Sequence, residues 1–169
     1  MSGEIVNRIA NSKLKTFDLE EIYPEGERVL FDIKDWLFEE LILKEKDFRN
    51  YVESFDWSQY KNSFVAVNCS VDAIIPTWAF MLVVSKLTPF ANKVIIGDLE
   101  MLETSIYQEL LNFIDYSEFE DAPVIVKGCS NKPIPNAAYS LLIEKIQPIA
   151  RKIMFGEACS NVPLYKSKK

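Results

Sequence analysis

Apolar residues follow two patterns that alternate along most of the chain. Four short runs, such as FVAV, are apolar on both faces of a strand, and they lie at 64–67, 94–96, 124–126 and 153–155. Four segments with helical spacing lie at about 45–55, 76–87, 99–114 and 135–146. Buried strands that alternate with helices are typical of a parallel sheet covered on both sides. We therefore expect an α/β fold with three layers, in which helices cover both faces of a parallel sheet of four strands, or five with an edge strand at 28–33.

One stretch of the sequence occurs twice, 59 positions apart. AFMLVVSKLTPFANKVIIGD begins at Ala79, and AYSLLIEKIQPIARKIMFGE begins at Ala138. The central lysine and proline and the late glycine of each stretch are identical, and upstream DWSQY pairs with DYSEF. Identities kept in register across a helix and a strand predict an internal duplication of a 59-residue unit. Its copies lie at about 41–98 and 100–157.

The length of 169 residues suits one domain. We expect a single α/β domain over 1–169, with an N-terminal arm at 1–27 and a short C-terminal tail at 158–169. A hydrophobic content of 49% is enough for a core without disulfides or a structural metal. Folding by itself therefore implies no cofactor.

The charge of the chain disfavours two classes of partner. A formal net charge of -6 repels nucleic acids and anionic membranes at long range. The first residues contain Glu4 and no continuous apolar segment, so they do not resemble a secretory signal. The longest apolar stretch, at 73–84, is broken by Pro76 and is too short to cross a bilayer of about 30 Å. We expect a cytoplasmic protein that binds neither nucleic acid nor membrane.

The sequence also lacks residues that common active sites require. Without histidine, every Ser-His-Asp or Cys-His mechanism and every histidine-ligated metal site is excluded. The five glycines form neither a GxGxxG turn nor a GxxxxGK loop, so the usual nucleotide-binding motifs are absent.

The three cysteines are the sharpest candidates for chemistry. Cys69 and Cys129 each follow the first strand of a copy, and Cys159 lies shortly after the last strand. Ligands of open α/β sheets bind at the carboxyl ends of strands, where three converging thiols would hold zinc or an iron-sulfur cluster. The spacings match no CxxC signature. Reactive thiols and ordinary buried cysteines remain as alternatives.

Three acidic residues share the predicted rim with the thiols. Asp98 and Glu157 occupy matched positions of the two copies, and Glu100 matches Cys159. Each carboxylate is a candidate further ligand or base. Asp98 and Glu100 also suit the first turn of the helix that follows, where a carboxylate stabilises the helix dipole.

Four long segments carry a resemblance to a known family. FDLEEIYPEGERVLFDIKDWLF, NCSVDAIIPTWAFML, KGCS followed by PIP, and IMFGEACSNVPLYK resemble the DUF2480 family, an uncharacterised family found mainly in Bacteroidetes. The resemblance covers almost the whole chain. It implies a free-standing cytoplasmic protein with a link to iron-sulfur cluster assembly, and it brings no established activity.

Three hypotheses for function follow from the sequence. The first is an accessory protein of iron-sulfur assembly that binds a metal or cluster through the cysteines and contacts other assembly proteins. The second is an enzyme that uses a thiolate or carboxylate without histidine. The third is a non-catalytic interaction module that forms a homo-oligomer.

Overall fold

The chain folds into two compact units. The computed structural model describes residues 13–128 and 131–168. Unit 2 is the continuous segment Pro24–Ile106, and unit 1 combines Met1–Tyr23 with Tyr107–Lys169. Helix α3 (Leu99–Phe113) contributes residues to both.

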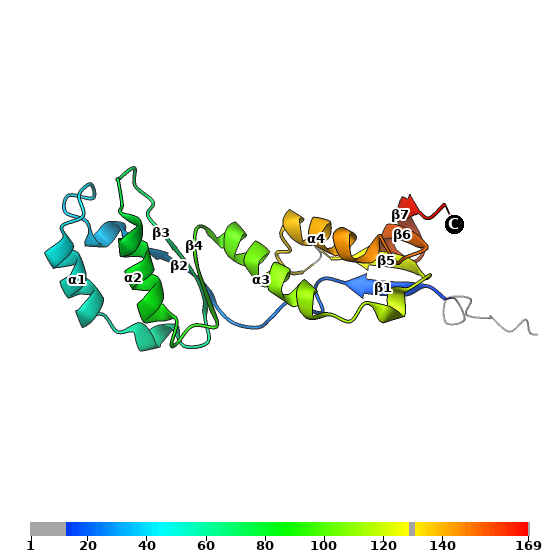
Figure 1. Cartoon of the computed structure of the whole chain (residues 1–169), viewed down its shortest axis with the longest axis horizontal. Helices are drawn as coiled ribbons and strands as arrows, with labels where there is room; N and C mark the ends of the chain where they lie inside the picture. Colours follow the sequence, from blue (N-terminus) through cyan, green and yellow to red (C-terminus); the bar gives the residue numbers. More distant parts are fainter. Residues whose placement is uncertain (1–12, 129–130, 169) are drawn as a thin grey trace, which may run out of the picture. The chain divides into compact units, whose positions relative to one another are not determined.

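Unit 2 is built on a three-stranded parallel sheet in the order β2-β3-β4. Its strands are β2 (Arg28–Asp32), β3 (Phe64–Asn68) and β4 (Lys93–Ile96). Its helices are α1 (Glu45–Ser54) and α2 (Thr77–Leu87), with short 3-10 helices at Ile33–Trp36 and Trp57–Tyr60. In Figure 1, α1 and α2 lie beside each other next to this sheet.

The core of unit 2 lies between the sheet and these two helices. In α2, Ala79, Val83 and Leu87 recur every four residues and are fully buried. They pack in one cluster with Val65 and Val67, which alternate on one face of β3. The sequence pattern thus places one apolar stripe of the helix on one face of the strand layer.

Unit 1 repeats this order of elements and adds a strand. Its sheet has the order β1-β5-β6-β7, in which β7 alone is antiparallel to its neighbour. The strands are β1 (Lys15–Asp18), β5 (Pro123–Lys127), β6 (Lys152–Glu157) and β7 (Ser160–Lys166). A 3-10 helix at Ser117–Phe119 precedes β5, and α4 (Asn136–Ile146) connects β5 to β6.

The core of unit 1 corresponds to that of unit 2 in its arrangement. Ala138, Leu142 and Ile146 form the buried stripe of α4 and pack with Val124 and Val126 of β5. The second half of α3 joins the same cluster. Each unit therefore buries its own set of apolar residues.

The prediction of one parallel sheet of four or five strands was wrong. The strands form two sheets, because β1 pairs with β5 while β2 pairs with β3. Each unit takes a first strand from the start of the chain, which completes a small sheet beside its own helices. The coarser prediction of a mixed α/β fold is confirmed. The single-domain boundaries stay a prediction, because two compact units can belong to one folding domain or to two.

Two strands lie in segments predicted to be an arm and a tail. The predicted arm at 1–27 contains β1, and the predicted tail at 158–169 contains β7. Strand β7 includes Pro163, which lacks an amide hydrogen and reads as a strand breaker. An edge strand tolerates proline, because one side of its backbone has no partner strand.

Aromatic side chains close the turn before the central strand in both units. Trp57 Nε1 donates to the Val52 carbonyl oxygen at 2.9 Å, and Tyr116 Oη donates to the Leu111 carbonyl oxygen at 2.8 Å. The two donors are 59 positions apart in the sequence, and so are the two acceptors. Burial raises the pKa of Tyr116 to about 12. These aromatic residues therefore hold the preceding helix to the turn.

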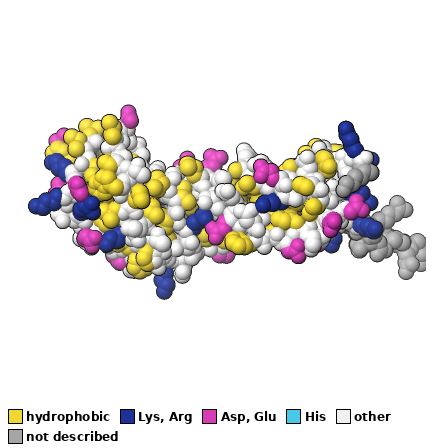
Figure 2. Space-filling view, in the orientation of Figure 1, with side chains coloured by type: hydrophobic (Ala, Val, Ile, Leu, Met, Phe, Trp, Pro, Cys, Tyr) yellow, Lys and Arg dark blue, Asp and Glu magenta, His cyan; other side chains and the backbone are white. Residues whose placement is uncertain are grey.

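Charged side chains of both signs are interspersed on the face drawn in Figure 2. This mixed surface is expected of a chain with 19 basic and 25 acidic residues. In residues 13–128 and 131–168, every helix is too short or too polar to cross a bilayer.

Candidate functional site

A polar crevice lies at the carboxyl ends of the parallel strands of unit 1. Its volume is about 430 Å³. Strand β1 contributes Asp18, β5 contributes Lys127 and β6 contributes Glu157. The remaining lining residues are Glu20, Gly128, Asn131, Phe155 and Gly156. The crevice occupies the place where open α/β sheets bind ligands.

Lys127 supplies positive charge to this crevice. Its Nζ lies 2.9 Å from Oε1 of Glu157. This hydrogen bond raises the pKa of Lys127 against an opposing effect of desolvation, and the charges of Glu157, Asp18 and Glu21 raise it further. A lysine held protonated acts as a fixed charge rather than as a base or a nucleophile.

Local hydrogen bonds hold two carboxylates of the crevice in place. Asp18 Oδ1 accepts from the backbone N–H of Glu20 at 2.9 Å. Glu20 in turn accepts from the backbone N–H of Asn131 at 2.9 Å and from its side-chain amide at 3.3 Å. With Glu157, the lining contains three carboxylates and one lysine. This balance favours a cationic or hydroxyl-bearing ligand group.

Gly128 brings the floor of the crevice into contact with α4. Its φ is +154°, and a Cβ atom there would lie 2.7 Å from Oη of Tyr139. A side chain at this position would be strained in its backbone and would also meet the phenol. Glycine is therefore required for the close approach of β5 and Tyr139.

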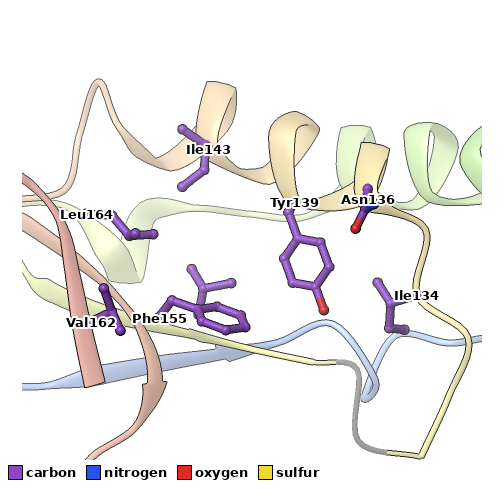
Figure 3. A pocket seen from close by; sticks show the side chains of 8 residues that line it. Ile134, Asn136, Tyr139, Ile143, Phe155, Val162 and Leu164 are labelled. Atoms are coloured by element: carbon purple, nitrogen blue, oxygen red, sulfur yellow. The ribbon is translucent and has the colours of Figure 1, made fainter. Parts of the chain in front are cut away.

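An apolar pocket of about 460 Å³ lies beneath α4 in the same unit. Figure 3 shows Tyr139 and Ile143 reaching into it from α4, with Val162 and Leu164 of β7 on one side. Val126, Ile134, Asn136 and Phe155 complete the lining. The volume falls within the range of about 300 to 1,000 Å³ that is typical of small-molecule sites.

The apolar pocket adjoins the polar crevice. Phe155 lines both of them. Tyr139 of the pocket also approaches Gly128 of the crevice, as described above. A single ligand with an apolar body and a polar end would match this pair of surfaces.

The cysteines do not form a cluster among the described residues. Cys69 follows β3 in unit 2, is half-buried, and its Sγ lies 3.6 Å from the Val71 carbonyl oxygen. Cys159 is exposed in the turn between β6 and β7 of unit 1. Cys129 lies outside the described residues. Over 13–128 and 131–168, no group of three or more Cys, Asp or Glu side chains is arranged to hold a metal ion. The metal site therefore stays a prediction.

The three predicted rim acids have different surroundings. Asp98 Oδ1 accepts from the backbone N–H of Met101 at 2.8 Å, which is the capping bond of α3. Glu100 lies in the first turn of the same helix. Glu157 lines the crevice and pairs with Lys127. Helix capping thus accounts for Asp98.

The sequence pattern did not predict several residues that line the crevice. Asp18 ends β1 and Glu20 follows it, and this strand lies in the segment predicted to be an arm. A repeated motif could have revealed it, because FDLEE at Phe17 resembles FDIKD at Phe31. In both motifs the aspartate accepts a hydrogen bond from the backbone N–H two residues later.

Comparison with known proteins gives a family match over almost the whole chain. A family model described as a protein of unknown function (DUF2480) matches residues 3–167. No curated protein and no solved structure matches the chain. The matched range contains every strand from β1 to β7 and both surfaces described above. The chain therefore belongs to the DUF2480 family.

Proposed function

We propose that this protein is a binding module for a small amphipathic molecule with an apolar body and a cationic end. The observation that carries the proposal is the adjacency of the apolar pocket and the acidic crevice, which share Phe155. The apolar body would lie between Tyr139, Ile143 and Leu164. Its cationic end would face Glu157 and Glu20.

The charge of the crevice supports the choice of a cation. Lys127 is already paired with Glu157, while Asp18 and Glu20 add two further carboxylates. Three carboxylates and one lysine line the crevice, so its charged groups offer more acceptor oxygens than donors to an ammonium group. A carboxylate ligand would meet like charges instead.

The test compares two ligands with the same apolar body, 4-phenylbutylamine and 5-phenylvalerate, by isothermal titration calorimetry. We expect the amine to bind about fivefold more tightly, because an exposed ion pair contributes up to about 1 kcal/mol. Glu157→Gln should reduce this preference. Equal affinities, or no binding of either ligand at millimolar concentration, would contradict the proposal.

Filling the pocket provides a matched pair of variants. Ile143→Trp places a larger side chain in the pocket, so we expect it to abolish amine binding. Ser140→Trp adds the same side chain at an exposed position of α4 and should leave binding intact. Both variants are first compared by circular dichroism to show that they fold.

Binding of zinc or an iron-sulfur cluster by Cys69, Cys129 and Cys159 is a second proposal, with a role in iron-sulfur assembly. It is favoured by the free thiols of Cys69 and Cys159, both of which reach solvent. Anaerobic purification followed by elemental analysis tests it, beside a variant with all three cysteines replaced by serine. Stoichiometric metal that the variant loses supports the proposal, and a metal-free protein that also fails cluster reconstitution contradicts it.

The matched positions of the two units support descent from one duplicated ancestor. Trp57 and Tyr116 donate to carbonyl groups at matched positions. Asn62 and Asp121, also 59 positions apart, share the unusual positive φ. We propose that each copy of the duplicated unit kept the turn and the central strand, and that β7 was added to the second copy.

A further inference from the structure

A second pocket lies in unit 2, at the carboxyl ends of β3 and β4. Its volume is about 270 Å³. Val67, Ile75, Phe80 and Ile96 are among its lining residues. Each of them stands 59 positions before a lining residue of the apolar pocket in unit 1, namely Val126, Ile134, Tyr139 and Phe155. The two units therefore form pockets from matched positions.

The second pocket differs from the first in size and polarity. Among the described residues its sheet ends at β4, so it has no counterpart of β7, whose Val162 and Leu164 line the pocket of unit 1. Phe80 replaces Tyr139, which removes a hydroxyl group. The polar side chain at its edge is Asn68, whose matched position in unit 1 is Lys127. The pocket thus suits a smaller, uncharged ligand.

Asn68 gives this pocket a specific polar requirement. Its Oδ1 is shielded from solvent and accepts no hydrogen bond from the described residues. A buried amide oxygen without a donor is destabilising. Asn68 lines the pocket, and because its last torsion is soft, a turn of the carboxamide can exchange Oδ1 and Nδ2 and present Oδ1 at the pocket wall. An N–H or O–H group of a ligand would then supply the donor.

We propose that unit 2 binds a small aromatic molecule carrying one hydrogen-bond donor, in the pocket between Phe80 and Ile96, with the donor directed at Asn68. Phe80 and Ile96 provide apolar walls, and the volume admits a one- or two-ring molecule. This site is separate from the amphipathic site of unit 1. Its test does not depend on whether that site binds amines.

Cys69 lines the pocket and serves as a native reporter of occupancy. The test uses the full chain with Cys129→Ser and Cys159→Ser, so that Cys69 is the remaining thiol. The rate of its alkylation by a maleimide is measured against increasing indole or 1-methylindole. We expect indole to slow alkylation, and 1-methylindole to require about five- to tenfold higher concentration, because it lacks the N–H donor.

Variants separate the pocket from the donor. Asn68→Leu should make the two indoles equally protective. Ala73→Phe fills the pocket and should remove protection, whereas Ile74→Phe alters a neighbouring side chain that is 96% exposed and should not. Alkylation that is unchanged by millimolar indole overturns the site. Equal protection by both indoles in the unsubstituted pocket overturns the role of Asn68, and this comparison needs no folded variant of the pocket.

Discussion

Nε of Arg28 lies 2.7 Å from Oε1 of Glu103, which joins strand β2 to helix α3 within unit 2. Both side chains are nearly buried, at 13% and 9% exposure. The guanidinium also donates to the carbonyl oxygens of Pro24 and Gly26 and lies over the ring of Phe64. Glu103 is therefore the counter-ion of a nearly buried guanidinium and not of a solvated surface charge.

Removing the carboxylate should destabilise the protein. We expect Glu103→Ala to lower the free energy of unfolding by about 3 kcal/mol, because Arg28 keeps a buried charge without its counter-ion. Urea denaturation followed by circular dichroism measures the change. The double variant Arg28→Met, Glu103→Leu should lose less than the single variant, since it leaves no buried charge.

An exposed ion pair provides the control for this prediction. Lys15 and Glu118 lie 3.3 Å apart in unit 1, with side chains 43% and 59% exposed. Glu118→Ala should cost less than about 1 kcal/mol, because solvent screens the pair. A loss from Glu103→Ala as small as that from Glu118→Ala would show that the buried pair contributes little.

Tyr116 should make stability depend on alkaline pH. Its pKa is about 12 in the folded protein against 10.0 for an ordinary phenol, because burial disfavours the phenolate. The protonated hydroxyl therefore stabilises the fold fully below pH 10, and this contribution is lost as pH rises through about 12. Unfolding free energies measured across this range should fall more steeply for the natural sequence than for Tyr116→Phe.

Tyr51→Phe is the matched substitution for this experiment, because it removes a phenol that is 47% exposed. It should leave the slope of stability against pH between 10 and 12 unchanged. Ultraviolet titration of the folded protein should lose a phenol that ionises near pH 12 in Tyr116→Phe and keep it in Tyr51→Phe. The prediction fails if Tyr116→Phe and the natural sequence show the same slope.

Gly128→Ala should be destabilising for two separable reasons. The φ of +154° disfavours any side chain, and the added Cβ would lie 2.7 Å from Oη of Tyr139. We expect a loss of about 1 to 3 kcal/mol in thermal or urea unfolding. In a Tyr139→Phe background the loss should be smaller, because the hydroxyl oxygen is gone while the backbone strain remains.

Gly156→Ala tests the specificity of that rescue. Its φ is +119°, and its Cβ would lie 2.7 Å from the backbone carbonyl oxygen of Ser160. Tyr139→Phe cannot relieve a clash with backbone, so the cost of Gly156→Ala should be equal in both backgrounds. Rescue of both glycine variants by Tyr139→Phe would argue against a direct contact between Tyr139 and position 128.

Local pattern was enough to predict the helices and most strands. The buried stripe of α2 at Ala79, Val83 and Leu87 has strong helical spacing, and the run at β3 is apolar on both faces. Helix α3 was expected at 99–114 and spans Leu99–Phe113. These elements bury continuous apolar surface, so the spacing of apolar residues identifies them.

The same pattern could not predict which strands pair with each other. Strand β1 is short and exposes Thr16 beside the buried Phe17, so it lacks the continuous apolar run that marks β3. The partner of an edge strand depends on which sheet can bury its one apolar face. That choice requires knowledge of both cores, and the sequence offered only the repeated Phe-Asp motif at positions 17 and 31.

The crevice lies where the sequence placed its expected site, and Glu157 was among the residues singled out there, but the predicted site itself stays a prediction. The carboxyl ends of the strands were expected to carry it, and Glu157 lies in the crevice. Asp18 depended on the missed strand, and Asn131 reaches Glu20 across 111 positions of sequence. Long-range hydrogen bonds of this kind leave no local pattern in the sequence. Cysteines, in contrast, can be read directly from the sequence as candidate ligands.

The discontinuity of unit 1 has a consequence for synthesis on the ribosome. Strand β1 is made before all of unit 2, yet its partner β5 is made after it. The emerging chain can complete the continuous unit 2 while β1 still has an unpaired edge. Closing β1 onto β5 then joins the ends of an already folded insertion, whose compactness shortens the loop to be closed. We therefore expect unit 2 to complete its contacts during synthesis before unit 1 does.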